Sequence, residues 1–417
     1  MIIGIDYRPA LLSRAGIGRY TREITTALAD HLADGDELRL FGASLARPDR
    51  LALEAGFAQR GPAVRLVSRR FPGRLLHFLG RLGLMGVETL TGPLDVFLYT
   101  DLVYPPLRRT ACVVVIHDLA FLRSSSFHES GFGAKVWCRM QPVLRRARSI
   151  IVPSPATAED LRGYAPFCAE RVEVVPHGCD HLMRIRSQLT RSPPGIVPDG
   201  PYFLAVGTWE PRKNWERVLH AFEAAIPLLS TRRAGEVSRE PEPLLVFAGT
   251  KGWLCSSFLD QVHLSPLRAR IRLIDEVDDG ELIRLYEGAL ALVYPSLWEG
   301  FGLPVAEALS LGCPVVTSKG SAMSWLATGA AQLVDPESVT EIAEAMAELA
   351  HDDGLRESLS RAGRERAGQA NWARAGAATL QVLKRLTPGC DHAGENESGA
   401  NRDDIGPNGS TCDRKES

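Results

Sequence analysis

The chain has 417 residues, of which 45% are hydrophobic and 24% charged, and its formal net charge is −2. This length suggests two or three domains, and the near-neutral charge excludes a strongly cationic nucleic-acid-binding protein. No apolar run approaches the ~20 residues of a membrane span. The eight cysteines form no Cys-x-x-Cys pair, which argues against a zinc site or a disulfide framework. With no signal-peptide pattern at the start, we expect a cytoplasmic protein.

Strand and helix patterns alternate along the chain, which predicts an α/β fold with parallel sheets. In the first half we expect strands at residues 2–5, 38–41, 64–67, 96–99, 112–116, 149–152 and 172–175. This half carries more Arg and Lys than Asp and Glu. The excess is compatible with an anionic acceptor or a membrane surface, and equally with an ordinary solvated exterior.

A glycine-rich turn, Arg14-Ala-Gly-Ile-Gly-Arg-Tyr20, separates the first strand from a helix with one apolar face. Gly16 and Gly18 permit a ligand to approach the backbone closely, so the turn is a candidate binding loop. Thr21 occupies the place of the third glycine of a dinucleotide fingerprint, and no NAD site is predicted. A tight turn without a ligand explains the same residues equally well.

Residues 69–85 interleave arginines with Phe and Leu. The pattern is compatible with a helix that lies on a membrane surface or meets a lipid-linked acceptor. A surface helix with one stripe facing the core is the alternative, and the sequence slightly favours it.

His117 and Asp118 directly follow the apolar strand at 112–116. Ligands of open α/β sheets bind at the carboxyl ends of the strands, so this pair is a candidate catalytic site. The alternative is a capping Asp beside a hydrogen-bonded His. We interpret His177-Gly178, after the strand at 172–175, as part of a turn and not as a metal site.

Residues 190–200 are rich in Pro and Gly and form the best linker candidate, after which a second α/β series begins. A strand at 202–206 leads into a loop that carries Arg212 and Lys213, with Asn214 expected as the N-cap of the next helix. Two adjacent cations at a strand end can neutralise a diphosphate.

The stretch at residues 290–309 combines a buried strand, a glycine-rich turn and a helix that opens at Pro304. Backbone N–H groups and the positive end of a helix dipole meet there and can hold an anion. Glu299 lies in the turn and Glu307 about one helical turn into the helix. Because carboxylates bind hydroxyls and not phosphate, the stretch indicates a sugar-bearing nucleotide.

Further strands are expected at 244–248, 271–274, 314–317 and 332–334, and helices at 338–350, 354–369 and 371–386. The polar residues after that predict a disordered tail.

Five stretches follow one another along the chain: His117-Asp-Leu, Val175-Pro-His-Gly-Cys-Asp, Val206-Gly-Thr-Trp-Glu-Pro-Arg-Lys-Asn, Phe247-Ala-Gly-Thr-Lys-Gly-Trp and Tyr294-Pro-Ser-Leu-Trp-Glu-Gly-Phe-Gly-Leu-Pro. In this order they resemble the retaining, nucleotide-sugar-dependent glycosyltransferases of family 4, which have the GT-B fold. The closest subgroup is the bacterial mannosyl- and rhamnosyltransferases of O-antigen and exopolysaccharide assembly.

The resemblance implies two Rossmann-like domains that face each other across a cleft. They would be an acceptor domain at 1–195 and a donor domain at 196–370, with a helix at 371–386 that crosses back and a tail at 387–417. It implies catalytic roles near the transferred sugar for His117, Asp118 and Glu299. Donor binding would involve Gly16, Gly18, Arg212, Lys213, Gly300, Phe301, Gly302, Leu303 and Glu307.

The reaction implied is transfer of mannose or rhamnose, with retention, to a glycan or a polyprenyl-diphosphate-linked glycan. GDP-mannose is the first donor candidate and dTDP- or GDP-rhamnose the second. We expect no cofactor and no metal, because the sole Asp-x-Asp triplet, Asp34-Gly35-Asp36, has the pattern of a turn. Peripheral contact with the inner membrane and no nucleic-acid partner are expected. The alternatives are a non-catalytic nucleotide-sugar-binding protein, or a GT-B enzyme of another reaction type, such as a phosphorylase or an epimerase.

One departure from the family pattern lies after the strand at 314–317. Ser324 and Trp325 stand where the family usually has Pro-Glu. The change affects activity or donor choice if the position contacts the donor, and is neutral otherwise.

Overall fold

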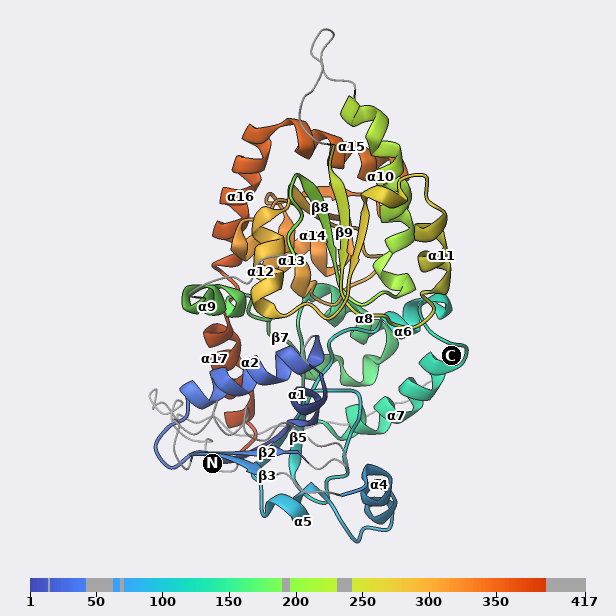
Figure 1. Cartoon of the computed structure of the whole chain (residues 1–417). Coiled ribbons are helices and arrows are strands. Elements are labelled where there is room, and N and C mark those ends of the chain that lie inside the picture. Colours follow the sequence, from blue (N-terminus) through green and yellow to red (C-terminus); the bar gives the residue numbers. More distant parts are fainter. Residues whose placement is uncertain (14–15, 43–62, 68–70, 190–195, 231–241, 388–417) are drawn as a thin grey trace, which may run out of the picture.

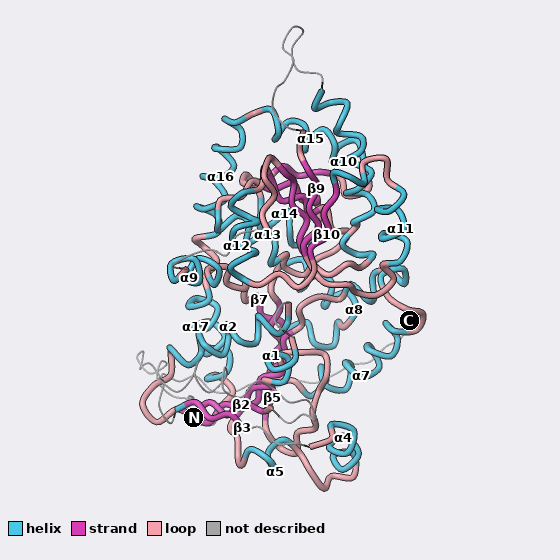
Figure 2. The backbone as a smooth tube through the Cα atoms, in the orientation of Figure 1, coloured by secondary structure: helices cyan, strands magenta, loops and turns pink. Residues whose placement is uncertain are grey.

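The computed structural model describes residues 1–13, 16–42, 63–67, 71–189, 196–230 and 242–387. Its strands form two parallel sheets, one in each half of an elongated molecule (Figures 1 and 2). The 7-stranded sheet has the order β3-β2-β1-β4-β5-β6-β7, and the 6-stranded sheet has the order β10-β9-β8-β11-β12-β13. The predicted GT-B architecture of two Rossmann-like units is therefore confirmed.

The strands match the continuous apolar runs of the sequence closely. In the first sheet they are β1 (Ile2–Asp6), β2 (Glu37–Phe41), β3 (Val64–Val67), β4 (Val96–Tyr99), β5 (Ala111–Val115), β6 (Ser149–Val152) and β7 (Val172–Val174). In the second they are β8 (Tyr202–Val206), β9 (Leu244–Ala248), β10 (Ile271–Ile274), β11 (Ala291–Tyr294), β12 (Val315–Ser318) and β13 (Gln332–Val334).

Helices connect the strands and cover both faces of each sheet (Figure 1). The first half contains α1 (Arg8–Leu12), α2 (Ile17–Asp30), α4 (Gly73–Arg81), α5 (Val87–Thr91), α6 (Ala120–Arg123), α7 (Phe132–Arg146), α8 (Pro155–Tyr164) and, from the end of the described chain, α17 (Trp372–Lys384). The second contains α9 (His181–Gln188), α10 (Trp215–Ser230), α11 (Ser256–Leu264), α12 (Asp279–Gly288), α13 (Leu303–Leu311), α14 (Ser321–Ala327), α15 (Val339–His351) and α16 (Asp353–Ala367).

Central strands are buried on both faces, as a sheet between two helix layers requires. Ile5 of β1 pairs with Leu40 on one side and Leu98 on the other. In the second sheet, Leu292 of β11 pairs with Leu204 and Val315. All are fully buried.

The strand order creates one switch point in each sheet, where the chain changes direction across the sheet. In the first sheet it lies between β1 and β4, and in the second between β8 and β11. Loops that leave neighbouring strands in opposite directions leave a crevice there. The glycine-rich loop of Gly16 follows β1, the loop of Lys213 follows β8, and the loop of Glu299 follows β11.

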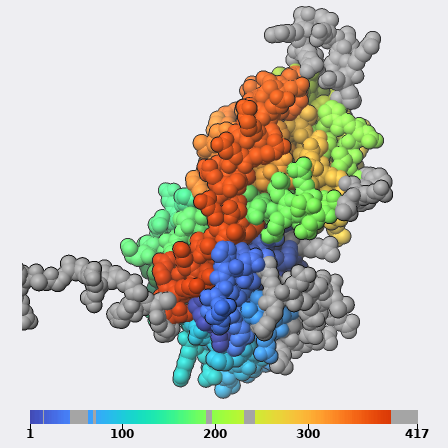
Figure 3. Space-filling model, turned by 90° about the vertical axis from the view of Figure 1, so that its left-hand side faces the viewer, coloured from blue at the N-terminus to red at the C-terminus, as the bar shows by residue number. Residues whose placement is uncertain are grey.

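The last helix, α17, returns to the first half and packs against α2, where a Cβ on Gly376 would lie 2.6 Å from Cβ of Ala27. Figure 3 shows α17 in red beside α2 in blue. Trp372, Leu380 and Leu383 join the core of the first sheet. The exact domain limits stay a prediction, and the predicted tail lies, from residue 388 on, outside the described residues.

Candidate active site

A cavity of about 350 Å³ lies between the two halves, at the carboxyl ends of strands from both sheets. All predicted site residues except Gly18 line it. They are Gly16, His117, Asp118, Arg212, Lys213, Glu299, Gly300, Phe301, Gly302, Leu303 and Glu307. Gly18 lies outside because α2 packs tightly against α1 there, and a Cβ on it would come within 2.1 Å of the Ser13 carbonyl oxygen.

Two cations and two carboxylates form a buried cluster at one end of the cavity. Nζ of Lys213 donates to Oε1 of Glu299 at 2.5 Å and also to the Tyr294 hydroxyl. Arg212 lies 2.9 Å from the same Oε1 through Nη1 and 2.6 Å from Glu210 through Nη2. The formal charges of the four side chains cancel, which makes their burial tolerable.

The pKa values of the cluster follow from burial and from this pairing. Burial raises the pKa of Glu299, but the Arg212 and Lys213 charges outweigh it and hold the pKa at about 2. Burial and the neighbouring Arg212 lower the pKa of Lys213. Burial raises the pKa of Glu210. Glu299 is therefore ionised at neutral pH.

Glu307 lies on the second wall of the cavity, in α13. Its Oε1 accepts a hydrogen bond from Nε2 of His181 at 2.9 Å, and its Oε2 accepts one from the Tyr286 hydroxyl at 3.2 Å. Trp372 donates to Nδ1 of His181 at 3.2 Å, which leaves the ring proton on Nε2, facing the carboxylate. Burial raises the pKa of Glu307, but Arg19 and His181 outweigh this effect, so the pKa lies below its usual value and the side chain is an anion.

The amino terminus of α13 opens into the same space. Gly302 precedes the helix with φ 89°, and no side chain caps it. That backbone angle favours glycine, and it turns the chain sharply from the Glu299 loop into the helix. The first N–H groups of a helix have no intrahelical partners, so this end can bind an anion.

His117 follows β5, and both of its ring nitrogens are hydrogen-bonded. Nε2 lies 3.0 Å from the Thr100 carbonyl oxygen, and Nδ1 lies 3.3 Å from Nε2 of His177. A carbonyl oxygen only accepts, so Nε2 carries the proton and Nδ1 accepts from His177. Burial lowers the pKa of His117 and holds that of His177 well below 6.5. Both rings are neutral at pH 7.

Asp118 has a local structural role, since its Oδ1 accepts a hydrogen bond from the Ala120 backbone N–H at 3.0 Å. The alternative interpretation of the His-Asp pair, a capping Asp beside a hydrogen-bonded His, thus describes its local bonding. The pair nevertheless faces the cavity.

The two halves touch directly beside these residues. A Cβ on Gly300 would lie 1.7 Å from the His117 carbonyl oxygen. The Gly300 carbonyl oxygen accepts a hydrogen bond from the Thr157 hydroxyl at 3.2 Å. Trp253 donates through Nε1 to the Phe127 carbonyl oxygen at 2.6 Å. These contacts join the two halves, so one wall of the cavity belongs to the first half and the other to the second.

Comparison with known proteins matches each half of the chain to a family of glycosyltransferases. The family model described as Glycosyltransferase Family 4 matches residues 14–181, and the one described as Glycosyl transferases group 1 matches residues 187–366. The chain belongs to the family 4 glycosyltransferases. It is therefore an enzyme of glycosyl transfer.

A curated relative agrees with this assignment, and two solved structures share the fold. The chain is 28% identical over 395 residues to O-antigen chain mannosyltransferase B of Escherichia coli, covering 89% of this chain and 96% of that protein. Sucrose-phosphate synthase of Thermosynechococcus elongatus superposes with a TM-score of 0.69 at 20% identity, covering 92% and 98% of the two chains. Anabaena HepE in complex with UDP-glucose superposes with a TM-score of 0.63 at 15% identity, covering 92% and 99%.

Several residues of the candidate site were not predicted from the sequence. His177, interpreted as part of a turn, lies in the loop after the edge strand β7 and also bonds His117; its position directly after a strand was the same signal that marked His117. Glu210 shares the loop of Arg212, and Arg19 follows the glycine-rich turn. His181 and Tyr286 lie on helices and gave no local signal.

Asn214 precedes α10, but its side chain does not cap that helix. Asn214 has φ 66°, and its Nδ2 donates to the carbonyl oxygens of Pro295 and Pro336 at 3.0 and 2.7 Å. The amide thereby ties the Lys213 loop to the loop that carries Glu299.

Ser324 and Trp325, which depart from the family pattern, lie on α14 and do not line the cavity. The Trp325 side chain is 36% exposed. The Ser324 hydroxyl donates to the carbonyl oxygens of Ser318 and Gly320 at 3.3 and 3.1 Å.

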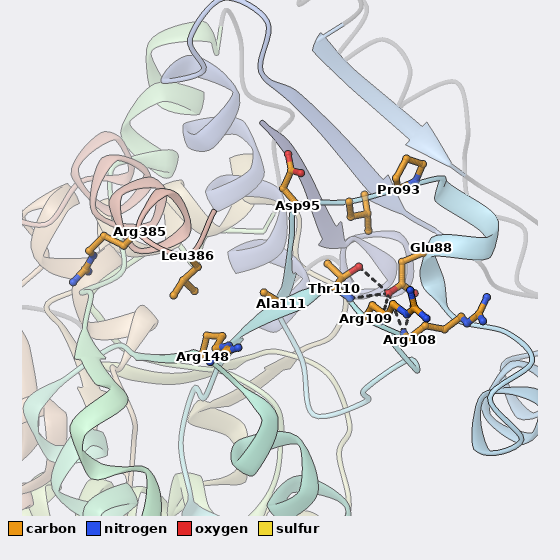
Figure 4. A pocket seen from close by; sticks show the side chains of 11 residues that line it. Glu88, Pro93, Asp95, Arg108, Arg109, Thr110, Ala111, Arg148, Arg385 and Leu386 are labelled. Carbon is orange, nitrogen blue, oxygen red and sulfur yellow. Dashed lines mark hydrogen bonds between the residues drawn. The ribbon is translucent and has the colours of Figure 1, made fainter. Parts of the chain in front are cut away.

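A larger cavity of about 830 Å³ lies at the opposite, amino-terminal edge of the first sheet (Figure 4). Arg108, Arg109, Arg148 and Arg385 line it. The carboxylate of Glu88 is already hydrogen-bonded there, since it accepts from the backbone N–H groups of residues 108–110. The cavity contains none of the predicted site residues, and its lining is basic.

Two further observations concern metals and membranes. Within the residues that the structure describes, no three His, Cys, Asp or Glu side chains gather as metal ligands would. Of the helices in the described ranges, none is both long and apolar enough to cross a membrane. The expectation of a metal-free reaction is left to experiment.

Proposed function

We propose that the enzyme transfers mannose from GDP-mannose, with retention and without a metal ion, to a glycan or a polyprenyl-diphosphate-linked glycan of a bacterial surface polysaccharide. The observation that carries this proposal is the single cavity in which Arg212, Lys213, Glu307 and the α13 amino terminus meet His117 of the other half. The similarity to O-antigen chain mannosyltransferase B supports mannose as the sugar. The neighbour solved with UDP-glucose supports a nucleotide-sugar donor.

The leaving group of such a reaction is a nucleoside diphosphate, whose negative charge grows as the anomeric C–O bond breaks. Arg212 and Lys213 would stabilise that charge together with the N–H groups of α13. Lys213 uses two of its three donors on Glu299 and Tyr294 and retains one for a phosphate oxygen. Glu299 keeps both cations in place through Oε1.

The bonding of His117 bears on how the acceptor loses its proton. Both ring nitrogens are occupied and the ring is neutral, so His117 has no free lone pair to act as a base. This favours attack on the face from which the phosphate departs, with a phosphate oxygen taking the acceptor's proton. His117 would then position the sugar.

Transfer from GDP-mannose to a tagged, mannose-terminated oligosaccharide tests the proposal. We expect product from the wild type, retained α-configuration by NMR, and unchanged rates in EDTA. Glu299→Ala and Lys213→Ala should lose activity, while Lys135→Ala, which removes an exposed lysine of α7, should keep it. Equal rates in all variants would overturn the catalytic assignment, and abolition by EDTA would overturn metal independence. dTDP-rhamnose and GDP-rhamnose serve as competing donors.

We further propose that α4 holds the enzyme against a membrane surface. Leu76 faces the core, whereas Leu75, Phe78, Leu82 and Leu84 are 42–62% exposed. Arg108, at the rim of the basic cavity in Figure 4, lies against Gly86 directly after this segment. An exposed apolar strip beside arginines suits an anionic lipid surface.

Vesicle flotation tests this contact. The wild type should float with vesicles containing phosphatidylglycerol more than with phosphatidylcholine alone, and Phe78→Ser/Leu82→Ser should not. Leu264→Ser removes a leucine that is 83% exposed on the other half and should behave as wild type. Equal flotation of all three proteins would contradict the proposal.

A further inference from the structure

Arg19 is the point at which the first half reaches into the donor half. Arg19 lies in the first turn of α2, directly after the glycine-rich loop, and is 8% exposed. Its Nη2 donates to Oδ1 of Asp279, at the start of α12, at 2.5 Å. The guanidinium therefore crosses from one half to the other at the wall of the cavity.

Among the residues that the structure describes, the second terminal nitrogen of Arg19 has no hydrogen-bond partner. Nη1 is buried, lies 3.7 Å from Oε1 of Glu307, and makes no hydrogen bond. A buried donor left unpaired is unfavourable because it has lost its hydrogen bonds to water, and such groups call for an explanation. Because Arg19 lines the cavity, a ligand oxygen is the partner that this nitrogen lacks.

Glu307 specifies what kind of oxygen fits. A carboxylate offers about four lone-pair sites, and His181 and Tyr286 use one on each oxygen. Acceptor sites therefore remain beside the unpaired donor of Arg19. A phosphate oxygen would be repelled by Glu307, whereas a hydroxyl can donate to Glu307 and accept from Arg19 at once.

We propose that Arg19 is a donor-binding residue that shares one ribose hydroxyl of the nucleotide sugar with Glu307. The inference rests on the proposed function, since it takes the ligand to be a nucleotide. Ribose recognition then needs one residue from each half of the enzyme, and the Asp279 carboxylate positions the guanidinium. Loss of Arg19 leaves Glu307 able to accept a hydrogen bond but removes the donor to the hydroxyl oxygen.

Calorimetric titration of GDP, 2′-deoxy-GDP and 3′-deoxy-GDP tests the proposal. The wild type should bind one deoxy nucleotide about tenfold more weakly than GDP, as expected for loss of a hydrogen bond to a charged group. Arg19→Gln should bind GDP about tenfold more weakly and show a smaller preference for the hydroxyl, because only Glu307 still bonds it. The control is Arg186→Gln, which should resemble the wild type. Arg186 lies on α9, and its Nε is 2.6 Å from Oε1 of Glu287, which lies on α12 like Asp279, so the substitution breaks a more exposed ion pair to the same helix.

The outcomes separate the possible roles. A merely structural Arg19 would weaken all three nucleotides equally in Arg19→Gln and keep the full ribose preference of the wild type, which would overturn the inference. If Arg19→Gln does not fold, Arg19→Lys, which keeps the charge but not the planar fork, must show the same reduced preference. If the wild type binds UDP or ADP in place of GDP, the donor assignment falls and the matching deoxy pair tests Arg19. If the wild type binds none of GDP, UDP and ADP, the proposed function and the inference both fall.

Discussion

Replacing Glu299 by Gln removes the charge on which the buried cations depend. The pKa of Glu299 falls from 4.5 to about 2, and at about 1.4 kcal/mol per pKa unit the site favours the charged form by about 3 kcal/mol. This agrees with the roughly 3–5 kcal/mol measured when one partner of a buried ion pair is removed. For a domain of this size we expect the apparent Tm to fall by about 6–12 °C.

The pH dependence of this loss follows from the sign of the shift. Because the folded-state pKa lies below the unfolded one, the stabilisation is complete above pH 4.5 and is lost only as the pH falls toward 2. The difference in Tm between Glu299→Gln and wild type should therefore be constant from about pH 5.5 to 8. Scanning calorimetry across that range measures it.

The control is Glu344→Gln, which changes an exposed glutamate on α15 of the same half. It should melt within about 1 °C of the wild type, as surface substitutions usually do. GDP should raise the Tm of Glu299→Gln by more than that of the wild type, because its phosphates meet cations that are no longer neutralised. A Tm loss below about 2 °C would refute the argument that Glu299 compensates the buried cations.

Three further predictions follow from the contacts between the halves and from the departure on α14. Gly300→Ala places a Cβ 1.7 Å from the His117 carbonyl oxygen, so the rate of sugar transfer should fall at least about tenfold. The control, Gly354→Ala, should not slow transfer, because its Cβ would lie at an ordinary contact distance of 3.4 Å from Oδ1 of Asp352. Trp325→Glu restores a carboxylate outside the cavity, and kcat/KM should stay within about twofold; a larger change in transfer assays would place the residue in the donor path. The urea midpoint of the wild type should fall as the pH drops below 6.5, since His117 and His177 have lowered pKa values and the unfolded chain binds more protons. The slope should flatten in His177→Gln, and an unchanged slope would show that this ring does not contribute.

Most of the fold and much of the candidate site could be predicted because both depend on local patterns. Strands buried on both faces are continuous apolar runs, and runs such as 202–206 and 271–274 coincide with β8 and β10. The ends of those runs predicted Arg212, Lys213 and His117, which all line the cavity, since parallel strands point their carboxyl ends to one edge. Gly18 does not line this cavity, because α2 packs closely on the end of α1 at that residue. Asn214 failed as a side-chain cap because its backbone is left-handed, with φ 66°, and its Oδ1 accepts a hydrogen bond from Nη1 of Arg217 at 2.8 Å.

By itself, the sequence determined the α/β architecture, the order of the elements and the loops that carry charge, since each depends on periodicity or on residues that are neighbours in the chain. Only the tertiary structure decided which groups meet. The pair His117–His177 joins residues 60 positions apart, His181–Glu307 joins residues 126 apart, and Arg19–Asp279 joins residues 260 apart. The first two contacts depend on how loops and helices far apart in the chain are brought together within one half, and the Arg19–Asp279 contact depends on how the two separately folded sheets are held against each other, chiefly by α17 and the loops around Gly300. No local pattern carries that information, because a side chain's partner across a cleft leaves no mark on its own neighbours in sequence.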